Sequence, residues 1–187
     1  MNDPIPPGQM SPQMSPKTSP VLALTHTALH KIKVHAMEAY PEECCGILVG
    51  TAGETGKEVL DVVRIGNARE ENRTRRFLIT PGEYAKAEAA AGAEGLGVMG
   101  FYHSHPDHPA RPSQFDLEHA WPWCSYVIVA VEGRIPAAVK SWVLKEDRSG
   151  FDEEIMNSVE RVAAGPAREN TGHAGSTRAH TTPGDRG

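Results

Sequence analysis

The sequence predicts an α/β domain in which a β-sheet is flanked by helices. Apolar, β-branched segments of strand length recur between residues 21 and 145 and are interleaved with two or three helical patterns. Hydrophobic residues make up 39% of the 187-residue chain, enough for one globular core. Both ends of the chain differ from this middle part in composition, so we expect the folded unit to span residues 21–156.

The two ends of the chain are predicted to be disordered. Residues 1–20 are rich in proline and serine and repeat a Ser-Pro pair, which favours an extended leader. Residues 157–187 are rich in alanine, glycine, threonine, arginine and histidine. They contain almost no large apolar side chains, so they cannot bury enough surface to offset the entropy of ordering.

A short strand followed by a helix opens the predicted domain. Residues 21–24 are apolar, and Thr25 is well placed to cap a helix that ends near Tyr40. Five apolar residues recur at helical spacing and predict the buried stripe of this helix: Leu29, Ile32, Ala36, Met37 and Tyr40.

The remaining elements follow in alternation. Residues 44–49 are a continuous apolar run closed by a glycine, which is typical of a central strand. Further strands are predicted at residues 59–65, 75–79, 97–103, 125–131 and 138–145. Helices are predicted at residues 81–91, where a proline occupies the first position, and at residues 113–120.

Composition and charge argue against several classes of protein. A formal net charge of −5 is unlike that of a general nucleic-acid binder, which carries a basic surface. Three cysteines give no even disulfide framework, and no apolar run approaches the roughly 20 residues that span a bilayer. The first residues also lack the apolar core of a signal peptide. We therefore expect a cytoplasmic protein with no nucleic-acid or membrane partner, and the oligomeric state stays open.

The segment with the most chemical content begins at His103. His103 and His105 are one residue apart at the end of a predicted strand, so their side chains point to the same face. Asp116 lies beyond a proline-rich loop and could complete a three-ligand zinc site with an open position for water. The alternative to a zinc site is purely structural: the two histidines are polar residues at a strand end, and Ser113 and Asp116 act only as a helix N-cap. The combination of both features favours a hydrolytic metal site.

A hydrolytic metal site also needs a base for its water. Glu43 is the candidate, since it lies at the mouth of the apolar strand 44–49, where a carboxylate can face a cleft. The alternative is a solvated acid just after a helix, which is what we expect of Glu42.

Other residues near the motif are not expected to take part in catalysis or metal binding. Ser104 points to the opposite face from the two histidines, which suggests a structural role. Exposed positions are expected for His108, Arg111 and His119. Buried, inert thiols are expected at Cys44, Cys45 and Cys124. Two interpretations stay open, core packing or the rim of the cleft, for Trp121, Trp123 and Tyr126.

Together these residues resemble the signature of the JAMM (MPN+) metalloprotease family. That signature has an upstream Glu, then His-x-His, a spacer that residues 106–112 fill here, and Ser-x-x-Asp. The resemblance covers residues 21–151 and implies a cytidine-deaminase-like α/β fold with a mixed, partly barrel-like sheet. It further implies zinc ligands at His103, His105 and Asp116, with Glu43 as general base and then acid. Ser113 would stabilise the oxyanion, and in that role its hydroxyl would not be free to cap the helix.

The resemblance implies a zinc peptidase or isopeptidase that cuts an amide at the C-terminus of a ubiquitin-like protein. The chain is similar to the compact bacterial type, some of which release an adduct from a sulfur-carrier protein; whether that adduct is cysteine, another amino acid or lysine stays open. The alternative is a non-catalytic MPN scaffold, although such modules typically lack some ligands. A zinc deaminase would need His-x-Glu with Pro-Cys-x-x-Cys, and Cys124 has no partner at that spacing.

Overall fold

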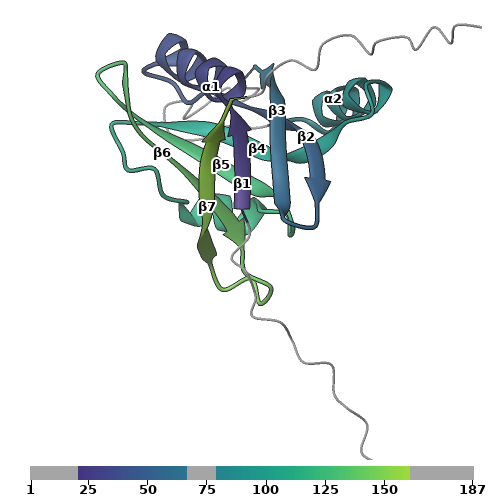
Figure 1. Cartoon of the computed structure of the whole chain (residues 1–187). Coiled ribbons are helices and arrows are strands. Elements are labelled where there is room, and N and C mark those ends of the chain that lie inside the picture. The colour runs from purple at the N-terminus through teal and green to yellow at the C-terminus, as the bar shows by residue number, and fades with distance from the viewer. Residues whose placement is uncertain (1–20, 67–78, 161–187) are drawn as a thin grey trace, which may run out of the picture.

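The computed structural model describes residues 21–66 and 79–160, which form a seven-stranded barrel with three helices. The strands are β1 (Val21–Thr25), β2 (Cys45–Gly53), β3 (Gly56–Ile65), β4 (Gly97–Pro106), β5 (Ser125–Glu132), β6 (Ile135–Leu144) and β7 (Phe151–Val159). The helices are α1 (His26–Ala39), α2 (Pro81–Ala93) and α3 (Gln114–His119). The strands close in the order β1-β3-β2-β4-β5-β6-β7 (Figure 1). Because β1 pairs in parallel with β3 and β7, and β4 with β5, while the other pairs are antiparallel, the sheet is mixed, as the family resemblance implies.

Helix α1 follows β1 directly and covers the core of the barrel. The Thr25 hydroxyl accepts a hydrogen bond from the Ala28 N–H at 3.2 Å, which confirms the predicted N-cap. Ile32 and Ala36 are buried, as the helical stripe predicts. The prediction is wrong for Met37, which is 42% exposed because it lies at the edge of that stripe.

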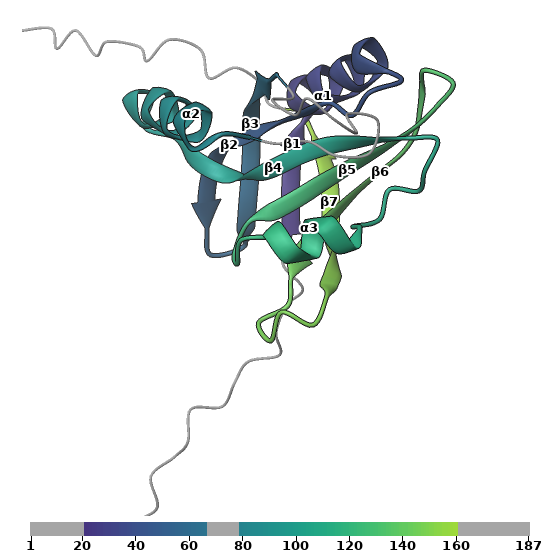
Figure 2. The same cartoon turned by 180° about the vertical axis from the view of Figure 1, so that it is seen from behind.

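Side chains alternate along β4 and separate the core from the candidate site. Tyr102 and Ser104 are fully buried, and Tyr102 belongs to the apolar cluster beneath α1. Phe101 belongs instead to the clusters beside α2 and α3, and His103 and His105 project on the same side as Phe101. Figure 2 shows α3 lying across this side of the sheet, in front of β5. The alternation therefore directs both histidines toward α3.

The last strand, β7, was not predicted from the sequence. It pairs in parallel with β1 from Val21↔Ile155 to Thr25↔Val159, and antiparallel with β6. The predicted domain boundary at Met156 falls inside this strand, so the folded part continues through Val159. The predicted strand at residues 75–79, apart from Ile79, lies outside the described residues, as do the predicted leader and most of the predicted tail. Within the described ranges, no helix is long and apolar enough to cross a membrane.

Candidate metal and catalytic site

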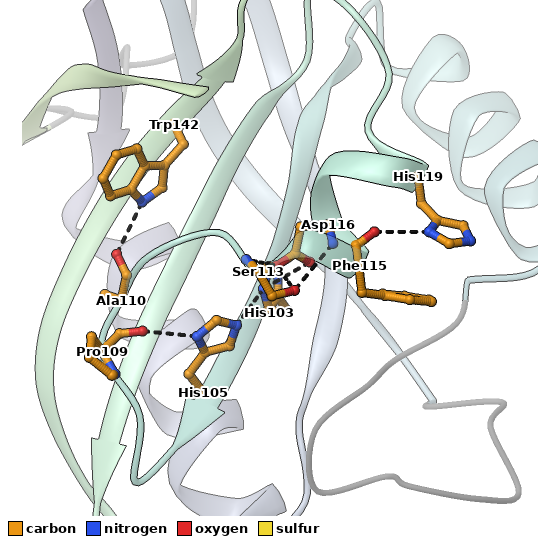
Figure 3. Close-up of polar contacts among 9 residues, drawn as sticks. All are labelled: His103, His105, Pro109, Ala110, Ser113, Phe115, Asp116, His119 and Trp142. Carbon is orange, nitrogen blue, oxygen red and sulfur yellow. Dashed lines mark hydrogen bonds and ion pairs between the residues drawn. The ribbon is translucent and has the colours of Figure 1, made fainter. Parts of the chain in front are cut away.

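Three of the predicted site residues meet where β4 ends and α3 begins (Figure 3). The Nε2 atoms of His103 and His105 are 3.1 Å apart, and Asp116 Oδ1 lies 3.5 Å from His103 Nε2. A tetrahedral zinc site with ligands at about 2.0–2.2 Å has ligand–ligand separations of about 3.3–3.6 Å. The two separations are close to this range, and the candidate ligand atoms of all three residues lie within 4.8 Å of one another, so the cluster could supply three ligands to one metal ion.

The loop after β4 fixes the orientation of His105. Its Nδ1 lies 2.9 Å from the carbonyl oxygen of Pro109, and since a carbonyl only accepts, Nδ1 carries the proton. This tautomer leaves the Nε2 lone pair directed at the cluster, which is how proteins commonly orient a metal-binding histidine.

Asp116 divides its two carboxylate oxygens between the helix and the cluster. Oδ2 accepts hydrogen bonds from the Ser113 N–H at 2.6 Å and the Ser113 hydroxyl at 2.7 Å. The Asp116 N–H in turn donates to the Ser113 hydroxyl at 3.2 Å, which completes a capping box on α3. Oδ1 faces His103. In this structure Ser113 therefore adopts the capping alternative, while its two bonds orient the Asp116 carboxylate.

Burial and nearby charges shift the pKa values of two of the candidate ligands, His103 and Asp116. Burial, together with the neighbouring His105, lowers the pKa of His103 despite the opposing effect of Asp116. For Asp116, burial raises the pKa, but His103 and the Ser113 hydrogen bonds outweigh it and lower the pKa below its usual value. A neutral imidazole and an ionised carboxylate are the forms that bind a divalent cation.

Glu43 lies two residues before β2, the strand that pairs with β4. In the antiparallel pair of β2 and β4, Cys45 lies opposite His103, and continuing that register brings Glu43 level with His105. Burial and the charge of Asp116 raise the pKa of the Glu43 carboxyl to about 8. The charge of Asp116, a predicted ligand, thus acts on the predicted base.

The other residues of the motif lie close to where the sequence predicts them. Ser104 is fully buried and bonds to the backbone of Cys44, in agreement with a structural role. His108, Arg111 and His119 are exposed. Buried free thiols are found at Cys44, Cys45 and Cys124.

An aromatic cavity beside Asp116 was not predicted from the sequence. Its volume is about 290 Å³, and Asp116 forms part of its wall. The rings around it belong to Tyr84, Phe101, Phe115, Trp121 and Tyr126. These residues come from α2, β4, α3, β5 and the loop before β5, so no continuous segment of sequence reveals the cavity. Trp121 thus rims the cleft, whereas Trp123 is 58% exposed and does not line it.

Comparisons with known proteins identify the family of this chain. The family model described as prokaryotic homologs of the JAB domain matches residues 25–145, which include all five predicted site residues. A desampylase from Haloferax volcanii is 34% identical over 64% of this chain and 88% of its own length. A probable TtuB-protein conjugate cleaving protease from Thermus thermophilus is 31% identical, over 67% of this chain and 78% of that protein.

A third relative and a solved structure extend the match. A CysO-cysteine peptidase from Mycobacterium tuberculosis is 27% identical over 75% of this chain and 93% of its own length. The solution structure of a Desulfitobacterium hafniense protein has a TM-score of 0.67 and 32% identity, covering 76% of this chain and 95% of that one. The named relatives are peptidases, which supports a hydrolase.

Proposed function

We propose that this chain, which belongs to the family of prokaryotic homologues of the JAB domain, is a zinc-dependent peptidase or isopeptidase. Its substrate is a ubiquitin-like protein of the sulfur-carrier type, and the bond it hydrolyses is an amide at that protein's C-terminus. The observation that carries the proposal is the cluster of His103, His105 and Asp116, with ligand atoms 3.1 and 3.5 Å apart. Relatives named as cleaving TtuB-protein conjugates and CysO-cysteine support the substrate class.

The residues present suit a zinc ion. His103, His105 and Asp116 would hold it, since two neutral imidazoles and one carboxylate form a ligand set that keeps one position open. When bound, zinc supplies a Lewis acid that polarises a carbonyl and lowers the pKa of water. The carbonyl of Pro109 and the cap at Ser113 keep two of the ligands oriented before any ion binds.

Glu43 is the residue that moves protons. Its carboxylate accepts a proton from the attacking water and then delivers that proton to the leaving amine, so the carboxylate is regenerated in each turnover. A pKa raised to about 8 in the absence of a cation places its proton affinity near neutrality, where a carboxyl can both accept and release a proton. A divalent cation nearby would lower this pKa and favour the ionised form that begins the reaction.

Ser113 is the proposed donor to the oxyanion that forms as water adds to the carbonyl. Its hydroxyl is bonded to Asp116 at 2.7 Å, so this role requires it to exchange that bond for one to the substrate oxygen. A neutral hydroxyl directed at the developing charge would stabilise it without adding a competing ion.

The proposal is tested by cleavage of a sulfur-carrier protein extended at its C-terminus through an amide. We expect the zinc-loaded protein to release the extension, and Glu43→Gln to reduce kcat by about 10²–10⁴-fold. Glu42→Gln is the matched control, because Glu42 is the adjacent acid and is less buried. It should retain activity. Full activity in a metal-free preparation, or in Glu43→Gln, would overturn the mechanism.

A further inference from the structure

We infer that the aromatic cavity beside Asp116 recognises a bulky apolar side chain of the substrate, and that Trp121 determines this specificity. The inference deepens the proposed function and rests on it. Asp116 belongs both to the metal cluster and to the cavity wall. A polypeptide whose scissile carbonyl reaches the cluster therefore places a side chain next to the scissile amide over the cavity.

The size of the cavity suits a single side chain. A volume of about 290 Å³ lies at the lower limit of the about 300–1,000 Å³ that is typical of small-molecule sites. The cavity is walled by ring edges and faces. The rings of Tyr84 and Trp121 have centroids 5.2 Å apart, and those of Phe101 and Trp121 are 5.8 Å apart, both edge-to-face. Figure 3 shows Phe115 and His119 on the side of Asp116 that faces away from His105.

Three hydroxyl groups of the cavity wall are already bonded within the protein. The Thr80 hydroxyl donates to Glu83 at 2.7 Å in the cap of α2, and the Tyr84 hydroxyl donates to Glu88 at 3.1 Å. The Tyr126 hydroxyl accepts a hydrogen bond from the backbone N–H of Trp121 at 2.6 Å. A polar or charged side chain entering the cavity would lose water without gaining these partners, whereas an apolar side chain would not incur that cost.

Trp121 is exposed on one side and yet firmly placed. Trp121 is 51% exposed, and its backbone N–H donates to the hydroxyl of Tyr126 at 2.6 Å. Farther along the same loop, the Lys57 ammonium donates to the carbonyl of Trp123 and lies 4.8 Å from the centre of that ring. The Trp121 indole itself packs edge-to-face on Tyr84 and Phe101, and an indole held in this way provides a large contact area at low cost in conformational entropy. It is therefore the wall residue best suited to discriminate among substrate side chains.

Trp123 offers a matched control. It is the same residue type in the same loop and is similarly exposed, at 58%, but it does not line the cavity. A general effect of removing an exposed indole from this loop would appear in both variants, whereas an effect on side-chain recognition would appear only in Trp121→Ala.

The experiment uses fusion substrates that vary one residue at a time. The two residues that flank the scissile amide, one on each side, are in turn replaced by Gly, Leu, Phe or Glu. We expect one position at which Leu or Phe exceeds Gly and Glu in kcat/KM by about 10–200-fold. Trp121→Ala should reduce this preference, measured as the ratio of kcat/KM for the Leu or Phe substrate to that for Gly, at least about tenfold; Trp121→Leu, which keeps a smaller apolar wall, should be intermediate. Trp123→Ala should behave as the parent protein.

Binding of the same tails to the Glu43→Gln variant, followed by tryptophan fluorescence, separates this inference from the proposed function. If the tails bind with the apolar preference but none is cleaved by the parent protein, the cavity inference stands and the peptidase proposal fails. If the fusions are cleaved without preference at any position, or Trp123→Ala loses preference as much as Trp121→Ala, the inference is overturned and the peptidase proposal stands.

Discussion

Ser104 and Cys44 are joined by two hydrogen bonds that fasten the Glu43 segment to the strand carrying the histidines. The Ser104 N–H donates to the carbonyl of Cys44 at 3.1 Å, and the Cys44 N–H donates to the Ser104 hydroxyl at 2.9 Å. Ser104 projects away from the proposed metal site, so we expect it to set the position of Glu43 without touching that site.

Ser104→Ala should impair catalysis without loss of the metal. The buried Cys44 N–H would lose its acceptor, which costs about 1–3 kcal/mol of unfolding free energy. We expect the displacement of Glu43 to lower kcat by roughly 10- to 100-fold, because small misplacements of a catalytic group are costly. Zinc content and kcat measured on one preparation check this.

Ser141→Ala is the control for Ser104→Ala. Ser141 is also fully buried, and its hydroxyl donates to Glu154 at 2.6 Å in a network that does not include the site residues. It should lose stability to a similar degree and keep its kcat. An unchanged kcat in Ser104→Ala would contradict the positioning role.

Ser113→Ala should weaken zinc binding as well as the helix cap. Loss of the cap costs about 0.5–2 kcal/mol, and loss of the bonds that orient Asp116 should lower zinc affinity about 10–100-fold. Thr80→Ala removes the same kind of capping box from α2, with no metal ligand attached. Competition titrations with a chelator should therefore show weaker zinc binding in Ser113→Ala alone. Equal affinities in both variants would exclude the orienting role.

The stability of the metal-free protein should depend on pH through Glu43. Its pKa is about 8 in the folded state against 4.5 in an unperturbed carboxyl, so the folded state retains a proton that the unfolded state releases. The unfolding free energy of the metal-free protein should therefore fall as pH rises from 4.5 to 8, because the unfolded state loses this proton more readily than the folded state. Urea unfolding should show Glu43→Gln more stable than the parent at pH 8 and equal to it near pH 4.5. A difference that does not vary with pH would contradict the raised pKa.

Most of the site was predictable because its features are local in sequence. The alternation of β4 and the Ser-x-x-Asp cap each involve a few adjacent residues, and they place His103, His105 and Asp116. The role of Ser104 follows from the same alternation. The aromatic cavity was not predictable, since its walls come from elements that only the closed barrel brings together.

Strand β7 could not be predicted from the sequence for a similar reason. No strand is predicted from the sequence after residues 138–145. In the fold, however, Glu154 is buried and accepts hydrogen bonds from Ser125 and Ser141 of neighbouring strands. Only the pairing of β7 with β1 and β6 provides these partners, and that pairing is not encoded in the local pattern.

The metal content of three variants tests the central claim most directly. Elemental analysis after incubation with zinc and removal of free metal should give about one ion per chain for Glu43→Gln and for His108→Ala, an exposed histidine in the adjoining loop. His105→Ala should retain almost none, because it loses the Nε2 atom that lies 3.1 Å from that of His103. Full zinc occupancy in His105→Ala, with an affinity equal to that of the parent, would contradict the assignment of this cluster as the metal site.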